Sequence, residues 1–243
     1  FQVVLSQRFE TKLTKRPIEI YKKLRVTNPS PFMFYFNFRD FQIIGASPEI
    51  LVRLRNNVVT IRPIAGTRPR GRNKKEDNFY KKDLLRDKKE LSEHLMLLDL
   101  GRNDTGKVSK INTVKVTESF NVEKYSHVMH IVSNVQGEFN NKFSKFDTLL
   151  SGFPAGTVSG APKIRAMEII DELENTKRKV YAGGIGYFSA NGDFDTCIAL
   201  RTALTKNKKF YVQSGAGIVA DSKPLNEFKE TVNKAKALLK ALE

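Results

Sequence analysis

An alternation of apolar and polar residues runs through the first quarter of the chain and predicts β-strands. Residues 1–10 (FQVVLSQRFE) form one such stretch, and residues 31–64 alternate through what reads as three further strands, with turns at FRD and RNN. A helix is expected between these stretches, near Pro17 to Leu24. The N-terminal part of the chain should therefore be mostly sheet.

Later segments change to the spacing of amphipathic helices. In residues 81–102, one helical stripe carries the leucines Leu84, Leu91, Leu95 and Leu98. A second helix should follow TVSGAP, with Pro162 near its first turn and Ile164, Ile170 and Leu173 among its apolar positions. A final helix is expected from about Pro224 to Leu242, and its apolar stripe consists of Phe228, Val232, Ala235 and Leu239.

Strand patterns return in residues 108–139 and 180–219, where Asn191-Gly192 and Asn207-Lys208 are hairpin signals. Strands in sequential groups, interrupted by single helices, predict an α+β fold with mostly antiparallel sheets. The pattern offers no place to divide the chain, so one domain over residues 1–243 is expected.

The composition is ordinary for a globular protein. It argues against a disulfide-stabilised protein and against one that crosses a membrane with helices. The chain of 243 residues has one cysteine, Cys197, so no intrachain disulfide can form, which suits a reducing compartment. Its apolar runs stay well short of the roughly 20 residues that a membrane helix needs. The chain opens on a strand-like segment without an initiator methionine, so we expect it to be part of a longer polypeptide.

The net charge of +16 raises the alternative of nucleic-acid binding, whose footprint is a clustered basic face. Here the lysines are scattered, and acidic residues interrupt the densest basic run, RGRNKKEDNFYKKDLLRDKKE. A solvated lysine-rich surface is the favoured interpretation. Attraction of a small anionic substrate remains open beside it.

Two pairs of carboxylates are the first candidates for chemistry. Glu90 and Glu93 flank the leucine stripe, and Glu227 and Glu230 share a helix face with Lys234. Spacing alone favours solvated charge pairs over a site. Two such pairs could together hold a hard divalent cation such as Mg²⁺, but spacing does not show that they meet.

Two glycine-rich segments precede helices and could receive a carboxylate or phosphate on their backbone N–H groups. They are GFPAGTVSGAPK (residues 152–163) and SGAGIVADS (residues 214–222). Tight turns are the plain alternative for both. Neither segment matches a P-loop or a dinucleotide fingerprint.

The three histidines are weaker candidates. His127 and His130 are three apart in a strand-like run, so they should point to opposite faces, which argues against joint metal ligation. An inward-facing histidine could be an acid, a base or a structural residue. Cys197 lies in an apolar run and is expected in the core.

Together these segments resemble the chorismate-utilising enzymes, and within them the large subunits of anthranilate synthase. The resemblance covers nearly the whole chain and rests on ten segments in the family's order: FQVVLSQRF, NPSPFMFYF, SPEILVR, PIAGTRPRG, EHLMLLDLGRNDTGKV, EKYSHVMHIVSNVQGE, FPAGTVSGAPKIRAMEIID, GGIGYF, CIALRTA and GAGIVADSKPLNEFKET. It implies a chorismate-binding fold, with mostly antiparallel sheets packed as a sandwich and helices outside. The N-terminal part of the family would be absent.

The resemblance also assigns roles. It implies that Glu93 and Glu230 ligate Mg²⁺, with Glu90 and Glu227 close by or acting through water, and that the ion binds the ring carboxylate of chorismate. Glu49 matches the acid that protonates the departing ring hydroxyl, and His130 matches a catalytic histidine. Hydroxyls that contact the substrate would come from Thr67 and Thr157, and its carboxylates would be held by Tyr187, Arg201, Lys234 and the backbone of Gly215, Ala216 and Gly217.

Two positions discriminate between the reactions of the family. Relatives that make 4-amino-4-deoxychorismate carry a lysine where this chain has Ala65, beside Gly66, and that amine can attack the ring. Relatives that add water carry a lysine as general base at the position of Gln2. Ala65 and Gln2 therefore favour direct attack by ammonia, which makes anthranilate and pyruvate as the first step of tryptophan biosynthesis.

The resemblance further implies a glutamine amidotransferase subunit as the ammonia donor, and L-tryptophan as a feedback inhibitor bound near Pro31, Phe32 and Met33. A buried aromatic strand is the plain alternative for these three residues. We expect a cytoplasmic or plastid-stroma protein without nucleic-acid or membrane partners. The alternatives are an aminodeoxychorismate synthase component I, and a non-catalytic fragment for tryptophan sensing or subunit docking.

Overall fold

The computed structural model describes residues 1–125 and 128–243. Ser126 and His127 lie outside the described residues, so the expected orientation of His127 stays a prediction. The chain divides into two compact units. Unit 1 comprises Phe1–Glu49, Pro154–Ile185 and Cys197–Glu243, and unit 2 comprises Ile50–Phe153 and Gly186–Thr196. The expectation of one domain over residues 1–243 stays a prediction.

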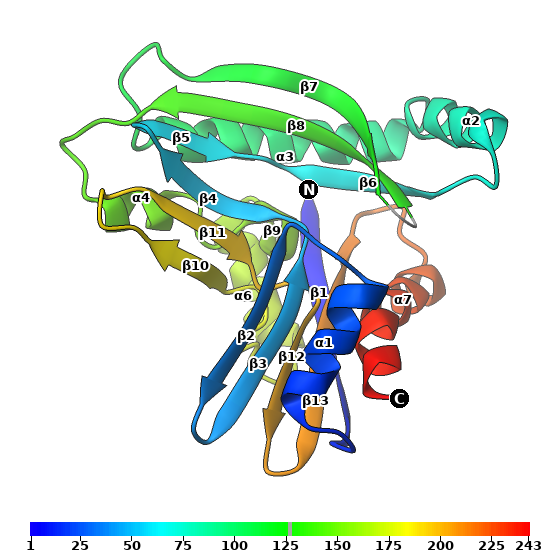
Figure 1. The fold of residues 1–243 in the computed structure, drawn as a ribbon. Helices are drawn as coiled ribbons and strands as arrows, with labels where there is room; N and C mark the ends of the chain where they lie inside the picture. The colour runs from blue at the N-terminus through cyan, green and yellow to red at the C-terminus, as the bar shows by residue number, and fades with distance from the viewer. Residues whose placement is uncertain (126–127) are drawn as a thin grey trace. The chain divides into compact units, whose positions relative to one another are not determined.

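A six-stranded antiparallel sheet forms the centre of unit 1 (Figure 1). Its strand order is β2-β3-β12-β13-β1-β9. The strands are β1 (Gln2–Lys12), β2 (Phe32–Phe38), β3 (Phe41–Ser47), β9 (Gly160–Ala161), β12 (Thr202–Lys206) and β13 (Lys209–Ile218). The long pairing of β1 with β13, from Val3↔Ile218 to Lys12↔Lys209, joins the two ends of the sequence.

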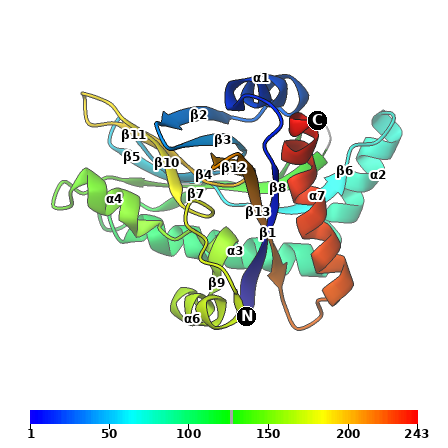
Figure 2. The same cartoon turned by 90° about the horizontal axis from the view of Figure 1, so that it is seen from below.

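Helices pack against this sheet because their apolar faces need cover from water. They are α1 (Pro17–Thr27), α5 (Gly156–Ser159), α6 (Lys163–Leu173) and α7 (Pro224–Leu242). Figure 2 shows α7 running along β13 and β1, with α1 beside its C-terminal end. Ile20, Ile44, Phe210 and Leu238 form the centre of the core between these helices and the sheet.

Unit 2 is built on a seven-stranded sheet with the order β10-β11-β4-β5-β8-β6, in which β7 also pairs with β8. The strands are β4 (Ile50–Arg55), β5 (Val58–Ile61), β6 (Ile64–Pro69), β7 (Lys115–Lys124), β8 (Val128–Glu138), β10 (Gly184–Phe188) and β11 (Phe194–Ile198). The helices are α2 (Lys74–Leu84), α3 (Lys88–Gly106) and α4 (Lys145–Ser151). The long α3 lies along β8, β6 and β5 (Figure 1).

The α+β fold with antiparallel sheets is confirmed. The last helix begins and ends where it was expected, and both hairpin signals lie between paired strands. Asn207 and Lys208 have φ values of 51° and 60°, as the two-residue turn between β12 and β13 requires. Cys197 is buried against Phe34 and Ile43, so its assignment to the core is confirmed.

Four details of the expectation were wrong. Residues 31–64 contain four strands, because the chain also breaks at Pro48-Glu49. Residues 81–102 belong to two helices, since Asp87 caps a new helix by accepting hydrogen bonds from the N–H groups of Lys89 and Glu90. Leu95 is 51% exposed, and the neighbouring His94 takes the buried position. The short helices α4 and α5 were missed.

The buried face of α7 also differs from the expected stripe. Phe228 is 53% exposed, whereas Glu227 and Thr231 are buried together with Ala235 and Leu238. The rotation has a polar cause, because the Ser214 hydroxyl donates to the Thr231 carbonyl at 2.7 Å and the Gln7 amide contacts the Thr231 hydroxyl. Similarly, Ile164 and Leu173 of α6 are exposed and Ala166 is its buried residue.

Among the described residues, no helix combines the length and the apolar character needed to cross a membrane.

Candidate active site

The most organised group of predicted residues in unit 2 lies where β6 pairs with β8. The pairing shifts register between Ala65 and Thr67, and Gly66 takes a φ of +69°. This bulge turns the Gly66 carbonyl toward His130, whose Nδ1 lies 3.0 Å from that oxygen and 3.1 Å from the Thr67 hydroxyl. Three residues that the resemblance had assigned separately therefore meet.

These contacts set the tautomer of His130. A carbonyl oxygen can only accept, so Nδ1 must carry the proton that it donates to Gly66. In the neutral ring, Nε2 then carries the lone pair. The arrangement is suited to a histidine that accepts a proton.

Glu90 belongs to the same neighbourhood. A Cβ built on Gly66 would lie 3.2 Å from the Glu90 Oε2 atom. Partial burial and the neighbouring Glu93 carboxylate raise the pKa of Glu90 above its ordinary value. We call Ala65, Gly66, Thr67, Glu90 and His130 the Gly66 cluster.

Arg68 follows Thr67 of this cluster and forms ion pairs with residues of α2 and at the start of α3. Its guanidinium donates to Asp83 at 2.6 Å and to Asp87 at 2.7 Å, and lies 3.5 Å from the Glu90 carboxylate. Asp87 is also the N-cap of α3, so one guanidinium holds the first turn of the helix that carries Glu90. The sequence reasoning missed Arg68, although its place directly after Thr67 in a basic loop was a usable signal.

In unit 1, the end of β13 gathers a second set of predicted residues. Lys234 donates to the Gly215 carbonyl at 2.9 Å and forms an ion pair with Glu230 at 2.7 Å. Gly215 cannot carry a side chain, because a Cβ there would meet the Tyr181 hydroxyl at 2.8 Å and the Leu5 carbonyl at 2.9 Å. Burial raises the pKa of Tyr181 to about 12, which keeps its hydroxyl protonated.

Ala216 and Gly217 follow Gly215 on β13, where they pair with Leu5 and Val4 of β1. Gln2 begins the same strand, is buried and pairs with Ala161 of β9. Thr157 lies in α5, which packs on β1. The Thr157 hydroxyl is buried and has no hydrogen-bond partner among the described residues, so it is a polar group that a ligand could satisfy.

Glu49 and Arg201 belong to another part of unit 1, where each is held by a backbone hydrogen bond. The Glu49 carbonyl accepts from the N–H of Ile198, and the Arg201 carbonyl accepts from the N–H of Ala46 at 3.2 Å. The Glu49 side chain is buried. Arg201 has a φ of 47°, and such strain concentrates at functional positions.

Four predicted residues lie apart from these groups. Tyr187 is on β10, at the opposite edge of the sheet from β6, and its hydroxyl is 3.4 Å from Arg55. Pro31 lies just before the edge strand β2 and is exposed. Phe32 and Met33 are the first two residues of β2 and pack against separate apolar clusters. The interpretation of Phe32 and Met33 as packed strand residues thus has direct support.

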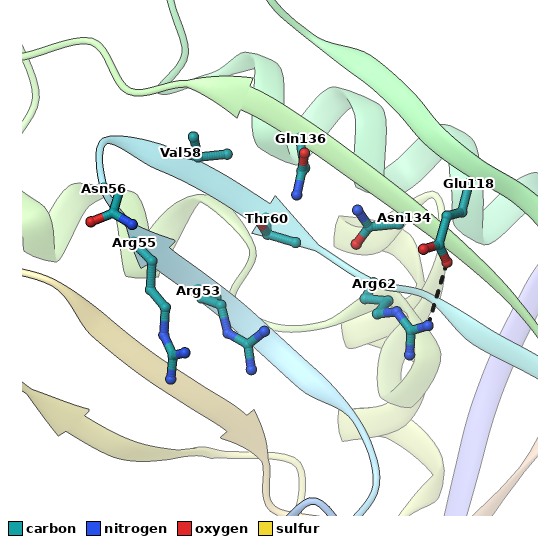
Figure 3. Close-up of a pocket in the computed structure, with 9 residues that line it drawn as sticks. All are labelled: Arg53, Arg55, Asn56, Val58, Thr60, Arg62, Glu118, Asn134 and Gln136. Atoms are coloured by element: carbon teal, nitrogen blue, oxygen red, sulfur yellow. Dashed lines mark hydrogen bonds and ion pairs between the residues drawn. The ribbon is translucent and has the colours of Figure 1, made fainter.

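A polar depression of about 420 Å³ lies on the sheet of unit 2 (Figure 3). It is lined by Arg53, Arg55, Asn56, Val58, Thr60, Arg62, Glu118, Asn134 and Gln136. Asp195 neutralises Arg53 and Arg55, at 3.0 and 2.6 Å, and Arg62 is paired with Glu118 and Glu123. The three arginines of the depression are therefore already paired with carboxylates of the same sheet.

The carboxylates in each unit suit a hard cation in their chemistry. Glu90 is partly desolvated beside Glu93, and the ionised form of such a pair gains from a nearby cation. In unit 1, Lys234 already supplies a positive charge to Glu230. Among the residues that the structure describes, no three acidic, histidine or cysteine side chains form a ready metal-binding cluster.

A family model described as chorismate binding enzyme matches residues 1–240. The chain therefore belongs to the chorismate-binding enzymes. Within this family it is 64% identical to anthranilate synthase component 1 of Cereibacter sphaeroides and 59% identical to that of Acetivibrio thermocellus, in both cases over 100% of the chain and 49% of the relative. The chain spans about half the length of the curated relatives it matches.

Solved structures agree on the fold. Anthranilate synthase component I from Streptococcus pneumoniae superposes with a TM-score of 0.92 at 52% identity, covering 98% of this chain and 53% of that one. The menaquinone-specific isochorismate synthase of Escherichia coli reaches a TM-score of 0.88 at 25% identity, with coverages of 100% and 56%. The fold thus spans different reactions, and individual residues must discriminate between them.

Proposed function

We propose that the chain is the chorismate-binding catalytic part of an anthranilate synthase large subunit. Chorismate and ammonia would give anthranilate, pyruvate and water. The observation that carries the proposal is the neutral Ala65 beside Gly66 on the bulged strand that binds His130. No amine is available at residue 65 to attack the ring, and Gln2 offers no general base for water. The names of the component 1 relatives support the same reaction.

The reaction would proceed in two steps. Ammonia attacks C2 of chorismate, and the C4 hydroxyl leaves as water with a proton from Glu49, which its burial favours. The intermediate, 2-amino-2-deoxyisochorismate, then loses the C2 proton while its C3–O bond breaks. The enolpyruvate that leaves takes up a proton and becomes pyruvate. We assign the C2 proton to His130, whose Nε2 lone pair follows from its Nδ1–H bond to Gly66.

The remaining predicted residues would hold the substrate and a Mg²⁺ ion. We propose Glu93 and Glu230 as ligands, with Glu90 and Glu227 close by or acting through water. The bound ion would neutralise and orient the ring carboxylate. We propose that the substrate's carboxylates are held by Arg201, Tyr187, Lys234 and the backbone of residues 215–217. The hydroxyl groups that contact the substrate would come from Thr67 and Thr157.

The proposal includes a glutamine amidotransferase subunit as the ammonia source and L-tryptophan as a feedback inhibitor near Pro31, Phe32 and Met33. The relatives named above are bacterial, which supports a cytoplasmic location and gives a plastid no support. Aminodeoxychorismate synthesis is the second candidate, and Ala65 argues against it.

The test is a steady-state assay of the polypeptide that carries this chain, with chorismate, Mg²⁺ and ammonium at mildly alkaline pH. Fluorescent anthranilate and pyruvate should form in equal amounts, and EDTA and Glu230→Ala should each abolish both products. Glu243→Ala, at the exposed end of the chain, is the matched control and should leave the rate unchanged. Turnover that survives EDTA would contradict the metal assignment.

A further inference from the structure

We propose that Tyr125 is a positioning residue that fixes the orientation of the His130 imidazole for pyruvate elimination, an assignment that rests on the proposed function. The two rings pack edge to face, with centroids 5.5 Å apart and planes at 63°. This is the preferred geometry for neighbouring aromatic rings, so the contact resists rotation of the imidazole about its side-chain bond.

Tyr125 is itself held in place. Its hydroxyl donates to the Glu123 carboxylate at 2.9 Å, and its backbone N–H donates to the Val128 carbonyl at 2.8 Å. Glu123 is the residue paired with His130 across β7 and β8. The tyrosine is therefore fixed at both its ring end and its backbone.

Arg62 anchors the far end of this series of contacts. Its guanidinium donates both of its terminal nitrogens to Glu123, and one of them lies 3.5 Å from Glu118 (Figure 3). The ion pair with Arg62 lowers the pKa of Glu123, which keeps the carboxylate ionised as the acceptor for Tyr125. A bidentate guanidinium also fixes the carboxylate plane.

His130 is thus constrained on two sides. The Gly66 carbonyl fixes the Nδ1 corner of the ring, and Tyr125 limits the tilt of the ring plane. The Gly66 carbonyl and the Thr67 hydroxyl both contact the Nδ1 corner of the ring, and contacts at one corner allow the ring plane to tilt about it. The packing against Tyr125 adds the restraint on that tilt and so helps to give Nε2 one direction. Without Tyr125, the proton acceptor would be present but poorly aimed, and a misplacement of about 1 Å can cost roughly a hundredfold in rate.

The experiment compares Tyr125→Leu, Tyr125→Phe and His130→Ala in the polypeptide that carries this chain. At saturating chorismate, Mg²⁺ and ammonium, the ratio of 2-amino-2-deoxyisochorismate to anthranilate is measured by chromatography. Tyr125→Leu should raise this ratio roughly ten- to a hundredfold while chorismate consumption falls much less. Tyr125→Phe, which keeps the ring, should raise it less. Tyr125→Leu added to His130→Ala should have no further effect on the ratio.

Tyr80→Leu is the matched control, because Tyr80 packs against Leu84, Met129 and Ile131 in the same unit. It should lower thermal stability and leave the product ratio unchanged. The proposal is overturned if Tyr125→Leu and Tyr80→Leu lower both steps in parallel, or if Tyr125→Leu leaves the ratio at the wild-type value.

A second readout separates this proposal from the proposed function. Ring ¹⁵N spectra report the His130 tautomer and the strength of its Nδ1–H bond without turnover. Tyr125→Leu should weaken the Nδ1–H signal and mix the tautomers, whereas Tyr80→Leu should not. If wild-type protein makes no anthranilate, the proposed function fails and the spectra still decide the positioning role; unchanged His130 signals in Tyr125→Leu overturn it.

Discussion

At the scale of single residues, Gly66 controls the geometry of the candidate site. Its φ of +69° is disfavoured for other residues, and a Cβ would lie 3.2 Å from atoms of Glu90, Ile131 and Leu84. Gly66→Ala should therefore lower the free energy of unfolding by about 1–2 kcal/mol. It should also reduce kcat, because the carbonyl must turn away from His130.

Chemical denaturation and initial rates measure both effects. Gly106→Ala is the control, since a Cβ at Gly106 meets nothing within 4 Å and alanine favours helices. That variant should keep its activity and gain up to about 1 kcal/mol of stability. A Gly66→Ala protein with wild-type rate would show that the bulge carbonyl does not orient His130.

We expect Asp77 to make the free energy of unfolding depend on pH in the acid range. It is buried and accepts from Arg70 at 2.7 Å, from the Gly71 N–H and from Lys124, and these partners, Arg70 first, hold its pKa well below its usual range. In the unfolded chain the carboxyl titrates near about 4. Its contribution is therefore fully present above that pH and is lost as the pH falls below it.

Asp77→Asn should lower the melting temperature at neutral pH and show a smaller further drop between about pH 5 and pH 3 than wild-type protein does. Thermal melts across that range measure the difference. Asp99→Asn, whose carboxylate is largely exposed in an i,i+3 pair with Arg102, should follow the wild-type pH curve. Parallel curves for wild type and Asp77→Asn would exclude the proposed role of Asp77.

At the scale of elements, Arg68 joins β6 to the end of α2 and the start of α3. Because it holds Asp87 and lies beside Glu90, Arg68→Met should loosen the turn that presents the proposed metal carboxylates. We expect the Mg²⁺ concentration for half-maximal activity to rise roughly tenfold or more, with a smaller change in the KM for chorismate. Titration with Mg²⁺ at saturating chorismate measures it.

Arg70→Met is the control for this prediction. Arg70 is two residues further along the chain and binds Asp77 and the Tyr125 carbonyl, without a contact to Glu90 among the described residues. It should lose stability and keep the wild-type Mg²⁺ requirement. Equal shifts in both variants would mean that only general destabilisation is being measured.

The elements also show how far a sequence pattern reaches. The limits of α7 and the turn at Asn207-Lys208 could be predicted, because proline and left-handed turn residues act locally. The division between α2 and α3 carried a signal that was not used, the N-cap Asp87. The buried face of α7 could not be predicted, because Thr231 is held by Ser214 from a distant strand.

At the scale of the whole molecule, the site residues illustrate the same limit. Thr67 and His130 are 63 residues apart in the sequence and meet only through the register of β6 and β8. The family resemblance named both residues, but neither periodicity nor spacing could bring them together. Tyr125 was missed because an aromatic residue that acts through a neighbour has no pattern of its own, whereas the signal for Arg68, its place directly after Thr67, was not used.

The net charge of +16 belongs to this chain, the part that we propose binds chorismate, and it gives a prediction for substrate binding. Chorismate carries two carboxylates, so a basic protein should attract it over distances that salt screens. Raising the ionic strength from about 0.05 M to about 0.3 M should increase the KM for chorismate several-fold, with little change in kcat. Neutral sucrose at matched viscosity is the control. A KM that does not depend on salt would assign the lysines to solvation alone.

The position of the new nitrogen in the product tests the proposed reaction most directly. The polypeptide that carries this chain is supplied with chorismate, Mg²⁺ and ¹⁵N-ammonium, and the products are identified by NMR. The expected products are pyruvate and anthranilate, with ¹⁵N on the ring carbon next to the one that bears the carboxylate. Labelled 4-amino-4-deoxychorismate, unlabelled isochorismate, or intact chorismate after incubation with folded protein would contradict the proposed reaction.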